Sequence, residues 1–108
     1  MHIVTVKHLK DAAEQYRDAA KEIAAWCKIV KDVRWWNFVE VRKVFKDADA
    51  VREYVIFNIR GNRYRLVTII HYSREKEGRL TEGHVYVRSF LTHKEYGDPS
   101  KWDKGVRR

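Results

Sequence analysis

Apolar residues recur at helical spacing in the first part of the chain and at alternate positions in the second part. His2 to Val6 is a short apolar alternation that predicts a first strand, and Thr5 is placed to cap the helix that follows. A second helical pattern begins near Asp18. Its apolar stripe consists of Ile23, Trp26, Cys27 and Val30. Cys27 is therefore expected to be a small buried hydrophobe rather than a reactive thiol.

The next segment predicts a third, short helix. Asn37 is its expected N-cap, and Glu40, three residues later, completes a capping-box pattern. The apolar residues of the helix are expected to face inward as far as Phe45. The pair Trp35-Trp36 has two interpretations: core packing with a hydrophobic staple onto Val41, or a platform on which bases stack.

After a polar connector, Lys46 to Ala50, the stretch from Tyr54 to Tyr72 predicts a β-hairpin that turns at Gly61-Asn62. Strand alternation then pairs Arg60 with Arg63, Asn58 with Arg65 and Ile56 with Val67 on one face. The other face carries apolar residues and is expected to be the core face: Val55, Phe57, Ile59, Tyr64 and Leu66. Because no acid stands beside the arginines within the hairpin, their clustering favours an anionic partner.

The remaining pattern completes an α+β domain. The charged segment Ser73 to Gly83 predicts a solvated loop, and His84 to Thr92 predicts the last strand. His93 to Tyr96 is expected to form one helical turn. The resulting order, β-α-α-α-β-β-β, predicts a single domain over residues 1–108, with helices on one face of a small twisted antiparallel sheet.

Composition narrows the class of protein. With 23 Lys and Arg against 15 Asp and Glu, the formal net charge is +8, which favours nucleic acid or an acidic protein as partner. The one cysteine excludes an internal disulfide framework and fits a reducing cytoplasm. No apolar run approaches the ~20 residues of a membrane span, so no membrane association is expected.

Motifs for cofactors are missing, whereas groups suited to RNA chemistry are present. The five histidines show no metal-ligand spacing, and no glycine-rich nucleotide loop occurs, so we expect neither a metal nor a cofactor. Arginines on rigid strands can bind phosphate, while His93 and Tyr96 can exchange protons. The groups in question are Asn58, Arg60, Arg63, Arg65, Arg88, His93, Lys94 and Tyr96. They suit metal-free RNA cleavage by the 2′-hydroxyl, but spacing alone leaves open a basic module that binds RNA or a partner without chemistry.

Two segments, FNIRGNRYRLVTIIHY and VYVRSFLTHKEY, resemble the HigB family of toxins from bacterial toxin–antitoxin modules, which belong to the RelE-like mRNA interferases. The start MHIVTVKHLKDAA and the segment WWNFVEVRKVF are also similar to this family, so the resemblance covers nearly the whole chain. The resemblance implies a RelE-like fold and cleavage of mRNA in the ribosomal A site. It also implies neutralisation by a helix-turn-helix antitoxin resembling HigA, with operator DNA bound only through that antitoxin.

The same resemblance assigns roles to residues. It implies phosphate contacts for Asn58, Arg60, Arg65 and Arg88, and acid–base work for His93 and Tyr96, with Arg63 and Lys94 as further RNA-binding candidates. Which of His93 and Tyr96 is acid or base stays open, and Arg63 beside the turn is alternatively only solvated. His71, on the same strand face as Arg65, is interpreted as structural.

Two features depart from the family pattern. The signature T-H-x-E-Y usually continues with an acidic residue, but this chain has Gly97 there and Asp98 one position later. The segment Ser73 to Gly83 is longer than the connection usual in this family. Two interpretations stay open: a species-specific insertion or a contact with the ribosome.

Overall fold

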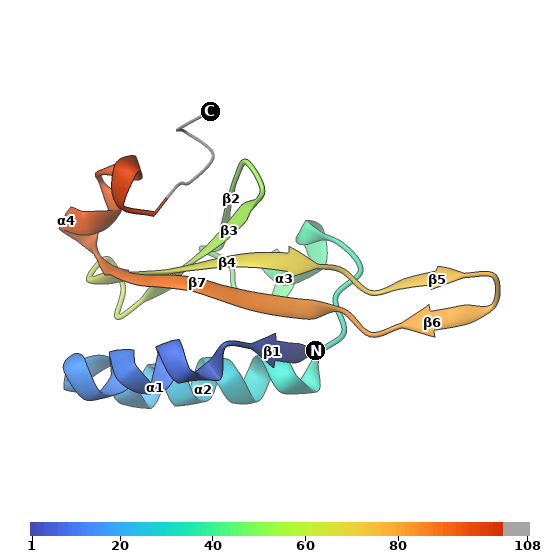
Figure 1. Ribbon diagram of the computed structural model, residues 1–108, viewed down its shortest axis with the longest axis horizontal. Coiled ribbons are helices and arrows are strands. Elements are labelled where there is room, and N and C mark those ends of the chain that lie inside the picture. Colours follow the sequence, from blue (N-terminus) through green and yellow to red (C-terminus); the bar gives the residue numbers. More distant parts are fainter. Residues whose placement is uncertain (103–108) are drawn as a thin grey trace.

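A five-stranded sheet with helices on one face forms the body of the computed structural model, which describes residues 1–102 (Figure 1). The strand order is β1-β7-β4-β3-β2. The first half of the chain contains β1 (His2–Val4), α1 (Val6–Gln15), the 3₁₀ turn η1 (Arg17–Ala19), α2 (Ala20–Asp32) and α3 (Phe38–Val44). The second half contains β2 (Asp49–Val51), β3 (Tyr54–Ile59), β4 (Tyr64–His71), β5 (Arg74–Lys76), β6 (Arg79–Thr81), β7 (His84–Thr92), α4 (His93–Tyr96) and η2 (Pro99–Lys101).

This architecture confirms the α+β class, with one correction to the sheet. Strands β2, β3, β4 and β7 are antiparallel to their neighbours, but β1 runs parallel to β7, with Ile3 opposite Val85. The sheet is therefore mixed rather than antiparallel, because the first strand joins its edge beside the last one. β2 was also missed, since the polar connector hides a three-residue strand.

The hairpin of β3 and β4 has the predicted register. Asn58 lies opposite Arg65 and Ile56 opposite Val67. The pairing ends at Ile59 and Tyr64, so Arg60 and Arg63 belong to the turn rather than to the strands. The φ of Arg60 is +56°, in the left-handed region, and this breaks the alternation on which the predicted Arg60–Arg63 pair depends.

The predicted N-cap of α3 is present, whereas the predicted N-cap of α1 is not. The Asn37 side chain accepts a hydrogen bond of 3.0 Å from the backbone of Glu40, as an N-cap does. The Glu40 carboxylate accepts from the backbone of Trp36 rather than from Asn37. Thr5 makes no side-chain cap and has a φ of +71°, so the predicted cap of α1 is wrong. Trp35 is buried in the core, whereas Trp36 is 41% exposed.

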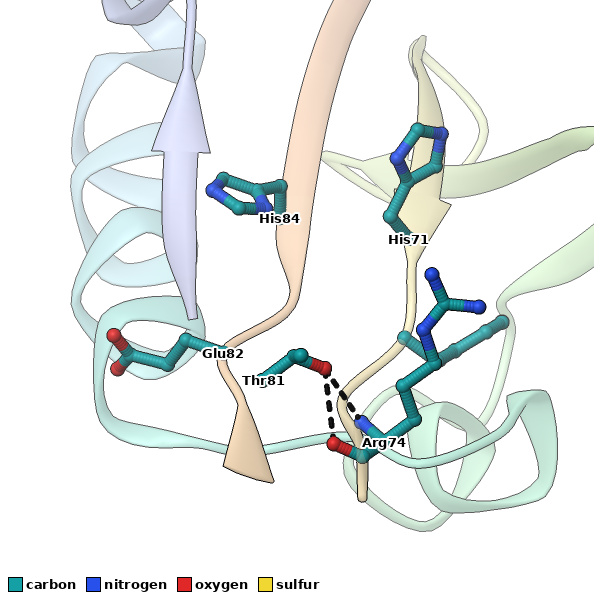
Figure 2. Close-up of a pocket in the computed structure, with 6 residues that line it drawn as sticks. His71, Arg74, Thr81, Glu82 and His84 are labelled. Carbon is teal, nitrogen blue, oxygen red and sulfur yellow. Dashed lines mark hydrogen bonds between the residues drawn. The ribbon is translucent and has the colours of Figure 1, made fainter. Parts of the chain in front are cut away.

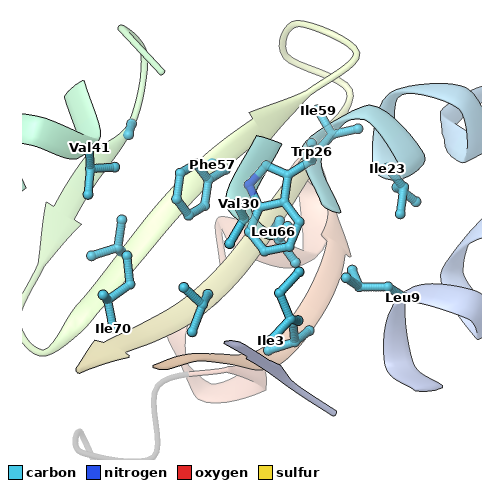
Figure 3. Close-up of a cluster of buried hydrophobic side chains, with 14 of the residues drawn as sticks. Ile3, Leu9, Ile23, Trp26, Val30, Val41, Phe57, Ile59, Leu66 and Ile70 are labelled. Carbon is cyan, nitrogen blue, oxygen red and sulfur yellow. The ribbon is translucent and has the colours of Figure 1, made fainter. Parts of the chain in front are cut away.

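The main core lies between the sheet and the helices. Trp26 and Val30 of α2 pack over Phe57 and Leu66 of the hairpin, and Figure 3 shows these side chains converging from the two layers. Trp26 meets the ring of Phe57 edge-on at 5.4 Å between centroids. Cys27 is half-buried against this core, and burial raises the pKa of its thiol, as expected for a packing residue.

A second, smaller cluster lies on the opposite face of the sheet. Its buried members are Tyr54, Ile56, Val67, Leu91 and Trp102. Trp102 follows η2, so the segment after α4 folds back over the sheet. This face is therefore partly covered, which leaves the groups near the hairpin turn as its accessible polar region.

The segment Ser73 to Gly83 is not the predicted loop. β5 and β6 pair with each other and extend away from the body as a two-stranded arm (Figure 1). Glu77 and Gly78, at its tip, have φ values of +54° and +76°, which suit a tight hairpin turn. All six strand residues of the arm are exposed, so its strands lack the apolar alternation by which strands are predicted.

Among residues 1–102, no helix has the length and apolar character needed to cross a membrane.

Candidate functional site

Arg65 is the centre of the candidate site. It follows the turn on β4, and its side chain is only 9% exposed. Nη1 donates to the carbonyl of Tyr64 at 3.1 Å, and Nη2 donates to the Asn62 side chain at 3.0 Å. These bonds fix the guanidinium in one orientation, which sequence reasoning missed because it assigned Asn62 only to the turn.

His93 lies beside this guanidinium. Its Nδ1 is 3.3 Å from Nη2 of Arg65, and its backbone N–H donates to the carbonyl of Arg63 at 3.0 Å. Because a guanidinium only donates, Nδ1 accepts, and the proton of the neutral ring lies on Nε2. The imidazole is exposed, so Nε2 is accessible to a bound molecule.

The motif T-H-x-E-Y places His93 and Tyr96 by means of a capping box. Thr92 accepts from the backbone N–H of Glu95 at 3.2 Å, and the Glu95 carboxylate accepts from the backbone N–H of Thr92 at 2.9 Å. These reciprocal bonds hold the single turn of α4, which directly follows β7. Thr92 and Glu95 of the motif thus have a structural role, and His93 and Tyr96 belong to the turn that they fix.

Tyr96 also lies close to Arg65. Cζ of Arg65 lies 5.6 Å from the centroid of the Tyr96 ring, and that ring stacks on Trp102 at 5.0 Å and 15°. Burial raises the pKa of Tyr96, and the Asp49 carboxylate adds to this, while Arg65 opposes it. The neighbouring arginine therefore does not produce the lowered pKa that a tyrosine base requires, and the phenol keeps its proton.

A hollow of about 350 Å³ opens beside Arg65 and Tyr96, and His93 is not among its lining residues. It is lined by Arg42, Asp47, Ala48, Asp49, Ile56, Asn58, Arg65 and Tyr96. Asn58 is thus brought to Arg65, as predicted. Arg42, Asp47 and Asp49 were not predicted, because they come from α3 and the connector and reach the hollow only through the fold.

The two arginines of the turn do not join this group. Nη1 of Arg63 lies 2.7 Å from Oδ2 of Asp18, on the helical side of the sheet. The backbone N–H of Arg60 donates to the Glu22 carboxylate at 2.9 Å. The expectation that no acid stands beside the arginines is therefore wrong for Arg63, whose guanidinium contacts Asp18, while Glu22 contacts the backbone of Arg60.

Arg88 and Lys94 are exposed, and within residues 1–102 no hydrogen bond or ion pair joins either side chain to Arg65, His93 or Tyr96. Arg88 occupies an irregularity of the β4–β7 pairing, between the pairs Val67–Ser89 and Thr68–Val87. Such a bulge re-aims a side chain from the regular alternation. Lys94 lies next to His93 on α4.

Asp98 does not replace the acidic residue that the family signature carries after its tyrosine. Its carboxylate accepts from the backbone and the hydroxyl of Ser100, at 3.1 and 2.7 Å, and so caps η2. These hydrogen bonds lower the pKa of Asp98. The carboxylates that reach the hollow are instead those of Asp47 and Asp49.

His71 lies at the far end of the same sheet face and belongs to a different hollow, at the base of the β5–β6 arm (Figure 2). Its ring packs against Tyr86 at 4.8 Å, which agrees with a structural role. Within residues 1–102, no three His, Cys, Asp or Glu side chains are grouped so as to hold a metal ion.

Comparison with known proteins identifies the family. The family model described as HigB_toxin, RelE-like toxic component of a toxin-antitoxin system, matches residues 19–98, which include the groups around Arg65. The chain is also similar to the mRNA interferase toxin HigB of Escherichia coli K12 and to the mRNA interferase HigB of Shigella flexneri, with 30% identity over 99 residues in each case. The alignments cover 89% of this chain and 88% of each relative. As the resemblance in the sequence predicts, the chain belongs to the HigB family of RelE-like toxins.

Proposed function

We propose that this protein is the toxin of a toxin–antitoxin module that cuts mRNA in the ribosomal A site by metal-free attack of the 2′-hydroxyl. Its class as an endoribonuclease follows from the family and from the names of its relatives. The observation that carries the finer proposal is that Arg65 lies close to both His93 and Tyr96, with Nη2 3.3 Å from Nδ1 of His93 and Cζ 5.6 Å from the centroid of the Tyr96 ring. A phosphate binder thus lies beside two groups that can exchange protons.

Arg65 is proposed to bind the scissile phosphate. Its burial removes competing water, and its fixed fork matches two phosphate oxygens. As the 2′-oxygen attacks phosphorus, negative charge grows on these oxygens, and a preorganised guanidinium stabilises it. Asn58 and Arg42 line the same hollow and are placed to contact the ribose or the neighbouring phosphate. Arg60, Arg88 and Lys94 are proposed to bind flanking phosphates, and we assign no RNA contact to Arg63 because Asp18 holds it.

The two proton-transfer roles are assigned from the environments of the side chains. When a phosphate binds the Arg65 guanidinium, the hydrogen bond from its Nη2 to Nδ1 of His93 breaks. Nδ1 can then accept the proton of the 2′-hydroxyl. Tyr96 keeps its proton because its pKa is raised, so it suits the general acid that protonates the departing 5′-oxygen. The bond from phosphorus to the 5′-oxygen breaks as the bond to the 2′-oxygen forms, which leaves a 2′,3′-cyclic phosphate and a 5′-hydroxyl. Proton exchange with water then restores neutral His93 and the Tyr96 phenol.

Dependence on the ribosome is part of the proposal. In the free protein, Nδ1 of His93 is already occupied by Arg65, and the hollow is open to solvent. An RNA must therefore be held in one geometry before the base is released, and the A site supplies that geometry. Free RNA has no such constraint and is expected to be cut poorly.

The proposed partners follow from this role. mRNA and the ribosome are the target, in the cytoplasm where translation takes place. A helix-turn-helix antitoxin resembling HigA neutralises the toxin and supplies any contact with operator DNA. No metal or organic cofactor enters the proposed reaction.

The test is cleavage of an mRNA in a reconstituted translation system, with the ends of the products identified chemically. We expect 2′,3′-cyclic phosphate and 5′-hydroxyl ends, and loss of cleavage in His93→Ala but not in His8→Ala, an exposed histidine of α1. Intact mRNA with the wild-type protein still bound would instead indicate a non-catalytic RNA-binding module. Equal cleavage of naked transcript would refute the dependence on the ribosome.

A further inference from the structure

Several apolar side chains on α3 and just before it are left uncovered by the fold. Val39 is 65% exposed, Val44 is 44% exposed, and Trp36, just before the helix, is 41% exposed. Within residues 1–102, only two other large apolar residues are exposed, Ile29 on α2 and Leu80 on the arm. Three of the five therefore gather at one seven-residue helix, which singly scattered surface residues do not do.

Positively charged side chains lie beside Val39. Val39, Arg42, Lys43 and Lys46 recur at helical spacing, and together with Phe38 they line a hollow of about 640 Å³. Three of these five residues are basic and none is acidic. Arg42 also donates to the carbonyl of Lys46 at 3.0 Å, so this cation is held at the end of the helix. We refer to these five residues as the α3 face.

The chemistry of the α3 face favours a protein segment over RNA. An RNA-binding surface presents cations together with aromatic or hydrogen-bonding groups on which bases stack or pair. Val39, the most exposed apolar side chain of the α3 face, offers neither a hydrogen bond nor a ring face, and Phe38 is half-buried against the core. An amphipathic helix with an apolar stripe and acidic flanks would cover Val39 and Phe38 and would pair with Lys43 and Lys46.

The α3 face is also continuous with the candidate site. Arg42 lines both the hollow on α3 and the hollow before Arg65. A third hollow, of about 330 Å³, is lined by Val44 and Lys46 as well as by Asn58. A segment bound on α3 therefore reaches Asn58 and Arg65 without crossing the sheet, and an acidic side chain of that segment can occupy the phosphate position.

We propose that the α3 face is the docking surface for the antitoxin, which binds it through an acidic amphipathic helix and thereby blocks access of RNA to Arg65. The inference rests on the proposed function for the identity of the partner. It goes beyond that function in assigning the surface, the chemistry of the partner segment and direct competition with RNA as the means of neutralisation.

The test uses the purified full-length toxin and the antitoxin encoded beside its gene. Val39→Asp and Lys43→Glu alter the α3 face without touching a residue assigned to RNA. Asp is tolerated at position 39 because this is the second residue of α3, where negative charge is favoured by the helix dipole. Leu80→Asp and Lys10→Glu are the matched controls: each makes the same chemical change at an exposed position elsewhere.

We expect the affinity for antitoxin to fall roughly tenfold or more in Val39→Asp and Lys43→Glu and to stay unchanged in the controls. All four variants should still arrest growth, but antitoxin co-expression should rescue only the wild type and the controls. Antitoxin should also displace a short RNA from the wild-type toxin.

Unchanged antitoxin affinity in both α3 variants would overturn the inference. If growth arrest alone were lost, the face would belong to the ribosome. If the wild type dimerised and Val39→Asp did not, with antitoxin affinity unaltered, the face would belong to a second copy. The proposed function is tested separately from this docking surface. It would be refuted if the wild-type protein neither arrested growth nor cut mRNA, and that result does not depend on what the α3 variants bind.

Discussion

Asp18 joins Arg63 across the two layers of the molecule, with Oδ2 of the carboxylate 2.7 Å from Nη1 of the guanidinium. The other carboxylate oxygen, Oδ1, accepts from the hydroxyl of Tyr64 at 2.7 Å. One residue of η1 therefore holds both the hairpin turn and the first residue of β4, and Arg65 is next in the chain. The position of the candidate phosphate binder thus depends on a carboxylate of the helical layer.

The first prediction concerns pH and this carboxylate. The hydrogen bonds from Tyr64 and Arg63 lower the pKa of Asp18 in the folded protein below its ordinary value of 3.8. A lowered pKa contributes stability that is present above the unfolded pKa and is lost as pH falls through the folded value. Between about pH 6 and about pH 3, the Tm of the wild type should therefore fall further than that of Asp18→Asn. Parallel Tm curves for the two proteins would contradict this linkage.

The second prediction concerns the fork of Arg65. Arg65→Lys keeps the charge but loses the paired donors, so cleavage of ribosome-bound mRNA should fall by about 10²–10³-fold. Arg79→Lys on the exposed arm is the matched control and should cut at the wild-type rate. Cleavage by Arg65→Lys at that same rate would show that charge alone suffices.

The third prediction separates the hydroxyl of Tyr96 from its ring. Tyr96→Phe retains the stack on Trp102 and the contact with Arg65, and it removes only the proposed acid. The cleavage rate should fall by about 10²–10⁴-fold, while RNA affinity changes little. A variant that cuts normally would leave Tyr96 as a platform for a base, whereas loss of affinity would assign it to binding.

The fourth prediction concerns the base of the β5–β6 arm. A Cβ at Gly83 would clash with the carbonyl oxygen of His71 and would lie 2.9 Å from the backbone nitrogen of Ser73, so the backbone must shift. Gly83→Ala should destabilise the fold by about 1–3 kcal/mol, as overpacking does. Gly97→Ala is the control, because its nearest contact would be an ordinary 3.4 Å from the Lys94 carbonyl oxygen. Equal Tm values for the two variants would indicate that the arm adjusts freely.

Much of the fold was predictable because local patterns report local structure. The hairpin register of Asn58 and Arg65 followed from alternation and a glycine turn, and the Asn37 cap followed from its spacing to Glu40. The arm was missed because its strands bury no apolar face, so its pairing depends on a turn rather than on a hydrophobic period.

The candidate site was predicted in part. His93, Tyr96 and Arg65 follow from the resemblance and from residue chemistry, and the fold brings them together. The acid beside Arg63 and the ring beneath Tyr96 come from Asp18 and Trp102, whose contacts are made across folded layers. No spacing rule along the chain connects such pairs, so only the structure could identify them.

The parallel pairing of β1 with β7 has a consequence for synthesis. β1 cannot pair until β7 has been synthesised, and β7 lies near the end of the described part of the chain. β7 also pairs with β4 and leads directly into α4, which carries His93 and Tyr96. A nascent chain that still lacks β7 therefore has neither the complete five-stranded sheet nor the turn that carries His93 and Tyr96, so the edge of the sheet and the candidate site depend on the same late-made strand.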